Sequence, residues 1–345
     1  MEMGTGKTRT ALELIAARYN AGKVNHILWL CPFSVKRTIE REIEKHAGHI
    51  KDLTICGIET LSSSIQANVR LLELVKSKKV YLVVDESNLV KNHRAKRTQN
   101  IIRLSEYCSY KLILNGTPIS RNEADLFAQW KIIDWRILGY RSFWSFAANH
   151  IEWDENIPGK IRRTLNVDYL TKKIAPYTYQ IRKEECLDLP YKRHFEYYCD
   201  LTDEQLDNYQ YVADELLFQI DEMKPHTIYR LFTGLQNVIS GFKVTFNKGE
   251  MLKDPLFKTP LDNPRIDLLL SVIERFDGKT VIFCKYTHEI NDIIRVLTEE
   301  FGQESALPFN GDVKQKERQE NLIKFEKESR FLVANKMTAG YGCFN

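Results

Sequence analysis

The stretch that decides the fold is Lys79-Val80-Tyr81-Leu82-Val83-Val84-Asp85-Glu86-Ser87, in which an apolar run ends in two adjacent carboxylates. An apolar run of this length between polar residues predicts a buried β-strand. Open α/β sheets bind their ligands at the carboxyl ends of such strands. Asp85 and Glu86 are therefore candidate site residues, although an acidic pair that ends a strand is also common as a simple turn.

A glycine-rich motif, Gly4-Thr5-Gly6-Lys7-Thr8, precedes this strand and opens a helical stretch. In such a motif the backbone N–H groups and the helix N-terminus bind phosphate oxygens, the lysine neutralises them and the threonine binds magnesium. A glycine turn that merely caps a helix would leave the Lys-Thr pair unexplained. Behind a phosphate loop, Asp85 can hold magnesium through water while Glu86 orients and deprotonates an attacking water. The two motifs together predict a nucleotide-hydrolysing site.

Short apolar strands alternate with amphipathic helices around these motifs, from Met1 to about Leu138. The expected strands are Ile27–Leu30, Leu53–Cys56, Val80–Val84 and Lys111–Leu114. The expected helices are Thr8–Tyr19, Val35–His46 and Ile65–Val75. This alternation is typical of an α/β domain with a doubly wound parallel sheet.

A second α/β pattern begins near Pro264, with strands expected at Thr280–Cys284, Ala306–Phe309 and Phe331–Ala334. Its expected helices are Arg265–Phe276, His288–Phe301 and Gln315–Lys327. The stretch before it is rich in helix formers and aromatic residues, with helices expected at Thr202–Met223 and His226–Ile239. The sequence therefore predicts three parts: residues 1–138 as a first lobe, 139–262 as a helical insertion and linker, and 263–345 as a second lobe.

Composition excludes several classes of protein. The formal net charge of the 345 residues is +4, too small to indicate nucleic-acid binding by itself. The seven cysteines form no Cys-x-x-Cys pair and no zinc spacing, so we expect reduced thiols and no structural metal. No apolar run approaches the roughly 20 residues that span a bilayer, and the N-terminus has no signal-peptide pattern. We therefore expect a cytoplasmic protein with no membrane partner.

The motifs occur in an order that resembles the Swi/Snf-related branch of superfamily-two helicases, especially its compact phage and bacterial members. The matching blocks are Glu2–Thr8 (motif I), Leu30–Pro32 with the helix to Glu42 (Ia), Asp85–Asn88 with Lys91-Asn92 (II), Leu114–Ile119 with Asn122 and Asp125-Leu126 (III), Val281–Tyr286 (IV), and Gly311–Phe325 followed by Thr338–Gly342 (V). The similarity covers almost the whole chain, and the ordered set is far more specific than any single block.

The resemblance implies two RecA-like lobes with parallel sheets that bind ATP and Mg²⁺ between them and move along double-stranded DNA. The implied ATP-binding residues are Gly4, Thr5, Gly6, Lys7 and Thr8, with Thr8 and Asp85 on magnesium and Glu86, Asp85 and Lys7 in catalysis. The implied coupling residues are Asn88, Gly116, Thr117, Gly340 and Gly342. DNA contacts, mainly to phosphates, are implied for Pro32, Ser34, Lys36, Thr60, Lys285, Tyr286 and Thr338. We expect a monomer in a bacterial or phage-infected cell.

Two features depart from the family pattern. Asn88 stands where most members have histidine, so this position can form hydrogen bonds but cannot titrate near neutral pH. The family also places a glutamine motif and a strand before motif I and an arginine-bearing motif VI after motif V, and neither fits in this chain. An arginine at the γ-phosphate contributes about 10³–10⁵ in rate. We therefore expect a chain cut short at both ends, with an incomplete second lobe and little or no activity of its own.

Other functions remain open from the sequence. A strand-separating helicase or a restriction-type motor would share the same ATP chemistry. An inactive fragment could bind DNA or a partner without turnover, and a phosphate-loop kinase or GTPase would leave the second lobe unexplained. The basic run at Lys91, His93, Arg94, Lys96, Arg97 and Arg103 is either a solvated face or a DNA-facing surface.

Overall fold

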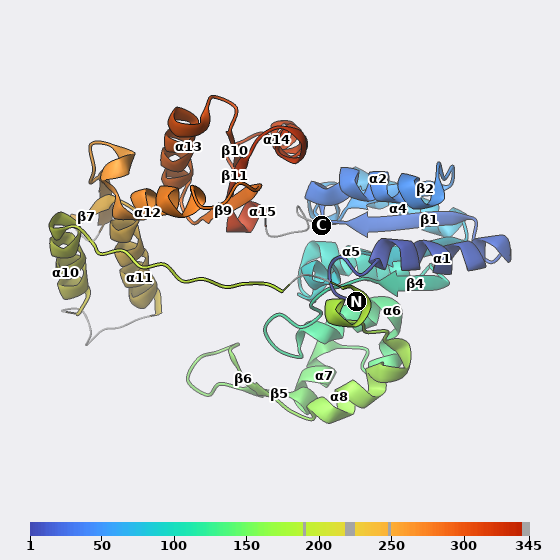
Figure 1. Cartoon of the computed structure of the whole chain (residues 1–345). Helices are drawn as coiled ribbons and strands as arrows, with labels where there is room; N and C mark the ends of the chain where they lie inside the picture. The colour runs from blue at the N-terminus through green and yellow to red at the C-terminus, as the bar shows by residue number, and fades with distance from the viewer. Residues whose placement is uncertain (189–190, 218–224, 248–249, 340–345) are drawn as a thin grey trace. The chain divides into compact units, whose positions relative to one another are not determined.

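The computed structural model describes residues 1–188, 191–217, 225–247 and 250–339. The chain divides into two compact units, the first formed by Met1–Pro190 and the second by Tyr191–Gly340 (Figure 1). Each unit contains a parallel sheet with its own helices.

The first unit is built on a four-stranded parallel sheet. Its strands are β1 (His26–Cys31), β2 (Leu53–Gly57), β3 (Val80–Val84) and β4 (Tyr110–Ile113), in the order β2-β1-β3-β4. The helices along this part of the chain are α1 (Lys7–Asn20), α2 (Lys36–Ala47), α3 (Thr60–Ser63), α4 (Ile65–Ser77) and α5 (Lys96–Ser105). The predicted strands and helices all occur, with bounds that shift by one or two residues.

The central strand β1 has no solvent-facing side, because all of its residues are buried. Leu28 and Leu30 lie in one core with side chains from α4 and α5. Ile27, Trp29 and Cys31 lie in a second core with side chains from α1 and α2. The residues of β3 alternate between the same two cores. Helices therefore cover both faces of the sheet, and the prediction of a doubly wound α/β fold is confirmed.

The first unit continues into a smaller helical part with its own core. Its elements are α6 (Asp125–Leu138), α7 (Phe143–His150), the antiparallel hairpin of β5 (Ile151–Trp153) and β6 (Ile161–Thr164), α8 (Val167–Ile174) and α9 (Lys183–Cys186). Phe127, Trp130 and Phe146 lie in this core. Trp130 is thus a packing residue, as buried aromatic residues most often are. Trp144 is 61% exposed, and the Arg94 guanidinium lies 5.5 Å from its ring centroid.

The second unit contains a three-stranded parallel sheet. Its strands are β9 (Thr280–Cys284), β10 (Ala306–Phe309) and β11 (Phe331–Asn335), in the order β10-β11-β9. The helices of this part are α12 (Pro264–Ile273), α13 (Thr287–Phe301), α14 (Gln315–Lys327) and α15 (Lys336–Ala339). Before the sheet come α10 (Asp203–Leu217), α11 (Pro225–Ile239) and the antiparallel hairpin of β7 (Phe242–Asn247) and β8 (Glu250–Pro255).

The region 139–262, expected as one helical insertion, is divided between the two units. Its first part packs on α6 through α7 and α8, because the aromatic residues there share a core with that helix. Its second part belongs to the second unit, where α10 and α11 pack on β7. The composition also did not predict the two hairpins. The sequence Lys248-Gly249 also predicts a turn, but these two residues lie outside the described residues.

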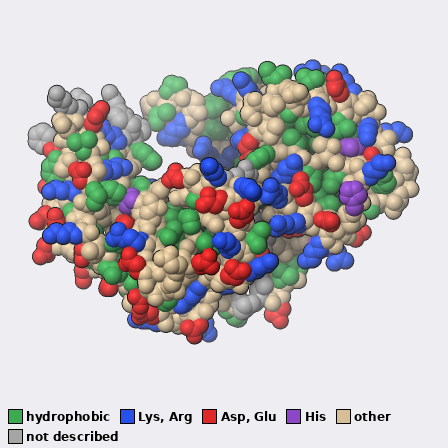
Figure 2. Space-filling view, turned by 90° about the horizontal axis from the view of Figure 1, so that it is seen from above, with side chains coloured by type: hydrophobic (Ala, Val, Ile, Leu, Met, Phe, Trp, Pro, Cys, Tyr) green, Lys and Arg blue, Asp and Glu red, His purple; other side chains and the backbone are tan. Residues whose placement is uncertain are grey.

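Charged side chains do not separate by sign on the face shown in Figure 2, where Lys and Arg lie among Asp and Glu. This agrees with the small net charge of the chain. None of the helices that the structure describes has both the length and the apolar character needed to cross a bilayer.

Candidate active site

The phosphate loop Gly4–Thr8 leads directly into α1, as predicted. Gly4 and Gly6 have φ angles of +78° and +84°, which side chains rarely permit, so both positions require glycine. Gly6 caps α1, and no described side chain bonds to the amides of its first turn. These N–H groups are therefore available to an anion.

The acidic pair lies beside this loop, at the carboxyl edge of the sheet. A cavity of about 290 Å³ is lined by Gly4, Gly6, Lys7, Thr8, Asp85 and Glu86. Thr5 is not part of the lining, and its hydroxyl donates to the carbonyl oxygen of Glu2 at 2.8 Å. The fold thus gathers all but one of the predicted ATP-site residues around one cavity.

The two carboxyl groups are in an environment that disfavours negative charge. Burial raises the pKa of Asp85 to about 6, and the Glu86 carboxylate adds to the rise. Burial also raises the pKa of Glu86, while the Lys7 ammonium opposes that rise. Glu86 has a φ of 47°, a left-handed backbone conformation that costs about 1–3 kcal/mol in a residue with a side chain. A buried carboxylate pair of this kind favours the approach of a cation.

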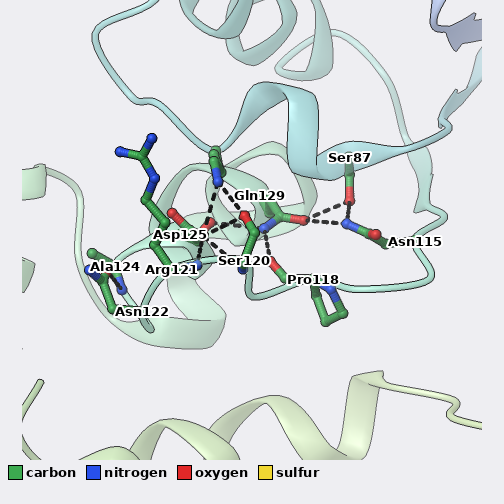
Figure 3. A network of polar contacts seen from close by, with 10 residues as sticks. Ser87, Asn115, Pro118, Ser120, Arg121, Asn122, Ala124, Asp125 and Gln129 are labelled. Atoms are coloured by element: carbon green, nitrogen blue, oxygen red, sulfur yellow. Dashed lines mark hydrogen bonds and ion pairs between the residues drawn. The ribbon is translucent and has the colours of Figure 1, made fainter. Parts of the chain in front are cut away.

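A buried polar network holds the loops after β3 and β4 to α6 (Figure 3). Ser87 Oγ donates to Gln129 Oε1 at 2.7 Å, and Asn115 Nδ2 donates to the same oxygen at 3.3 Å. Gln129 Nε2 donates to the carbonyl oxygens of Pro118 at 2.8 Å and Asp125 at 2.9 Å. Gln129 was missed by the sequence analysis. The available signal was a glutamine within an otherwise apolar run of α6.

Asp125 extends this network to the basic run. Its Oδ2 accepts from the backbone N–H and the hydroxyl of Ser120, both at 3.0 Å, and from Lys91 Nζ at 3.4 Å. The ring of His93 stacks on Phe143, with centroids 3.7 Å apart. Lys91 and His93 therefore have partners within the first unit, so these two residues contribute to its packing.

The predicted coupling residues of the first unit lie on the same loops. A Cβ atom on Gly116 would be 3.4 Å from Met3 Cγ and 3.9 Å from Lys7 Nζ, so Gly116 lies against the phosphate loop. The N–H of Thr117 donates to Asn115 Oδ1 at 2.9 Å. Asn88 Oδ1 is buried and accepts no hydrogen bond from a described residue. Gly340 and Gly342 lie outside the described residues.

The predicted DNA-contacting residues of the first unit share one edge of its sheet. Pro32, Ser34 and Lys36 follow β1, and Thr60 follows β2, its parallel neighbour. The N–H of Phe33 donates to Glu59 Oε2 at 2.9 Å and ties the two loops together. Ser34 is exposed, whereas Pro32 is buried and lines the cavity.

The predicted DNA-contacting residues of the second unit also share one edge. Lys285 and Tyr286 follow β9, and Thr338 lies in α15 after β11, the strand that pairs with β9. Asn335 Nδ2 donates to the carbonyl oxygen of Lys285 at 2.8 Å and joins the two strand ends. The Lys285 ammonium lies 5.3 Å from the Tyr286 ring centroid. Each unit thus presents a cluster of candidate phosphate-contacting groups.

Two family models match the chain, the SNF2-related domain over residues 49–243 and the helicase conserved C-terminal domain over residues 264–339. The TATA-binding protein-associated factor mot1 of Schizosaccharomyces pombe is 28% identical over 240 residues, which are 59% of this chain and 12% of mot1. The SWI/SNF chromatin-remodeling complex subunit snf22 of the same organism is 27% identical over 310 residues, 80% of this chain and 18% of snf22. The chain thus spans less than a fifth of the length of either relative.

Among solved structures, the chain is similar to the SWI2/SNF2 ATPase core of Sulfolobus solfataricus in complex with dsDNA. The TM-score is 0.45 and the identity 22%, over 97% of this chain and 72% of that chain. Both curated relatives are eukaryotic proteins, so they do not support the expected phage or bacterial type. The SNF2-related model alone covers more than half of the 345 residues. The chain therefore belongs to the family of helicase-like proteins that carry the SNF2-related domain.

Proposed function

We propose that this chain is part of an ATP-dependent motor that moves along double-stranded DNA. The observation that carries the proposal is the single cavity that brings together Lys7, Thr8, Asp85 and Glu86. A phosphate loop and an acidic pair on one cavity provide the groups for hydrolysis of a nucleoside triphosphate. The family consists of helicase-like ATPases, and snf22 is a subunit of a chromatin-remodeling complex, which supports DNA as the track.

The residues of the cavity fit ATP and Mg²⁺. The uncapped amides at the start of α1 and the Lys7 ammonium would hold phosphate oxygens. The Thr8 hydroxyl and the Asp85 carboxylate are the oxygen ligands that Mg²⁺ prefers, and its charge would offset the burial of Asp85. When bound, Mg²⁺ would neutralise charge on the phosphates. Glu86 would orient the attacking water and accept its proton.

The two sheets would act as the two lobes of the motor. Asn88, Gly116 and Thr117 lie on loops that also contact the phosphate loop or the network around Gln129. A movement of the phosphate loop on ATP binding or hydrolysis would thus be transmitted to the loops after β3 and β4. The clusters at Ser34–Lys36 and at Lys285-Tyr286 would contact DNA phosphates, with little preference for sequence.

Two substitutions test the ATP site. Lys7→Ala is expected to weaken ATP binding by about 10-fold or more, because it removes a charged phosphate contact. Glu86→Gln is expected to keep ATP binding and to lower DNA-stimulated phosphate release by about 10²–10⁴-fold, because it removes a general base. Lys23→Ala, at an exposed lysine of the same unit, is the control. Equal loss of ATP binding in both site variants would contradict these roles.

A second experiment distinguishes movement on duplex DNA from strand separation. A motor that moves on duplex DNA displaces a third strand bound in the major groove and leaves the duplex intact. Release of single strands from the duplex would instead identify a strand-separating helicase, and ATP-independent DNA binding alone would identify a binding protein.

A further inference from the structure

A segment far along the chain is hydrogen-bonded to the start of the phosphate loop. The backbone N–H of Glu2 donates to the carbonyl oxygen of Ile181 at 3.1 Å. The backbone N–H of Lys183 donates to Oε2 of Glu2 at 2.8 Å, across a separation of 181 residues in the sequence. Glu2 therefore holds Ile181–Lys183 against the phosphate loop.

Glu2 also supports the loop itself. Its carbonyl oxygen accepts from the hydroxyl of Thr5 at 2.8 Å, from the backbone N–H of Thr5 at 3.4 Å and from Lys7 Nζ at 3.4 Å. One residue thus bonds to the loop through its carbonyl oxygen and to the distant segment through its amide and carboxylate. A shift of the segment would move the loop with it.

The side chain of Lys183 lies over Gly4. A Cβ atom placed on Gly4 would be 3.6 Å from Cε and 3.7 Å from Nζ of Lys183. Gly4 lines the cavity that also contains Lys7. In the part of the chain that the structure describes, no acidic side chain pairs with the Lys183 ammonium. A positive charge without a counter-ion thus lies beside the loop to which phosphates would bind.

We propose that Lys183 is a second phosphate-binding cation of this site and that Glu2 positions it. Since the ligand is taken to be a nucleoside triphosphate, this inference rests on the function proposed above. A lysine suits the task because its ammonium is a compact charge on a flexible stem and can follow the phosphates. Lys183 lies shortly before Tyr191, where the second unit begins. ATP would therefore be contacted from the segment that leads into that unit.

Two properties separate this role from that of an exposed lysine that only raises the local positive potential. A direct contact with the phosphate chain depends on the number of phosphates in the ligand. Positioning by Glu2 also acts through Lys183, so a change of Glu2 has no further effect once the lysine is gone. Both properties can be measured by binding at equilibrium.

The experiment measures the affinity of ATP, ADP and AMP for the parent chain and for its variants. Lys183→Met is expected to weaken ATP binding about 10-fold, from loss of a charged contact, and AMP binding less than about twofold. Lys183→Arg restores most of the ATP affinity because it restores the charge. Lys172→Met removes an exposed lysine of α8 in the same unit and leaves both affinities unchanged. Melting temperatures of all variants show that each is folded.

Glu2 is tested in the same assay. Glu2→Ala is expected to weaken ATP binding about threefold, and the double variant Glu2→Ala/Lys183→Met binds no more weakly than Lys183→Met alone. Glu2→Gln keeps an oxygen acceptor for the Lys183 amide, so it is expected to bind ATP like the parent. If Glu2→Ala does not fold, Glu2→Ser, whose side chain is too short to reach the Lys183 amide in the same way, takes its place in the cycle. Additive effects in the double variant would overturn the positioning role.

The outcomes also separate this inference from the proposed function. If Lys7→Ala weakens ATP binding as expected while Lys183→Met changes nothing, the inference about Lys183 is wrong and the proposed function stands. If Lys7→Ala leaves ATP binding unchanged, the proposed function itself fails. An equal effect of Lys183→Met on ATP and AMP would show that Lys183 does not contact the phosphate chain.

Discussion

The hydroxyl of Ser87 donates a 2.7 Å hydrogen bond to Oε1 of Gln129, and both side chains are almost fully buried. Gln129→Leu keeps the volume but leaves the Ser87 hydroxyl and the Pro118 carbonyl oxygen without this partner. We expect a loss of about 2–3 kcal/mol in the free energy of unfolding, because unpaired buried polar groups are costly. Urea unfolding followed by tryptophan fluorescence measures this loss. All five tryptophans lie in the first unit, so the signal reports on that unit.

The control for Gln129→Leu is Gln66→Leu, the same substitution at an exposed glutamine of α4 in the same unit. We expect it to change the free energy of unfolding by less than about 0.5 kcal/mol. Equal urea midpoints for the parent and the Gln129 variant would show that the network does not stabilise the first unit.

A side chain at Gly57 is expected to destabilise the first unit. A Cβ atom there would lie 2.7 Å from Cδ2 and 3.0 Å from Cβ of Phe33, so the loop after β1 would have to move. Gly57→Ala should therefore lower the free energy of unfolding by about 1–3 kcal/mol. Calorimetry measures the change, with Gly278→Ala as the control because nothing lies within 4 Å of the added atom. Similar melting temperatures for both variants would argue that the Phe33 loop adjusts freely.

His26 is expected to make stability depend on pH. Burial lowers the pKa of His26 and the Lys78 ammonium lowers it further, while Asp52 opposes both. The unfolded chain therefore binds the proton more readily than the folded chain. The contribution of neutral His26 to the free energy of unfolding is complete above the ordinary histidine pKa of about 6.5. It is lost as the pH falls through the lower pKa that His26 has in the folded chain. The stability advantage of the parent over His26→Gln should shrink between pH 7 and pH 5.

The control for this pH dependence is Gln66→Leu, which removes no titratable group. Its stability difference from the parent should stay constant over the same range. A His26→Gln difference that is also constant would mean that His26 has the same pKa in the folded and unfolded chains.

Binding to DNA is expected to fall steeply with salt and to depend little on base sequence. Lys285→Ala should weaken binding to all duplexes alike and reduce the slope of log K against log salt by about 0.9, the value for one lost phosphate contact. Titrations at several salt concentrations measure the slope. Lys327→Ala, at an exposed lysine of α14, should leave it unchanged. A sequence-dependent loss would indicate a base contact at Lys285.

The sheet, and the meeting of the glycine-rich loop with the acidic pair at one cavity, could be predicted because both depend on contiguous stretches of the sequence. The strand β3 is a continuous apolar run because both of its faces are buried, and the acidic pair follows it directly. Gly4–Thr8 is likewise a contiguous motif. These features depend on neighbours in the sequence, so periodicity and spacing suffice to find them.

The supporting contacts could not be predicted, because their partners are distant in the sequence. Gln129 acquires its role only when α6 brings it beside Ser87, and Glu2 only when Lys183 approaches it. The division of residues 139–262 between two units also depends on which core the aromatic side chains join. Composition shows that aromatic residues are frequent in this region, but it does not show in which core each of them is buried.

Successive side chains of β1 lie alternately in two cores, so the chain cannot gain or lose a residue within this strand without disturbing both. Removing one residue from β1 would send Trp29 into the space that holds leucine side chains and a leucine into the space shaped for an indole. Both cores would then be mispacked by a single event. A residue added to the exposed stretch between β5 and β6 would reverse no side chain of the parallel sheet. In β1, therefore, insertions and deletions are excluded far more strictly than substitutions.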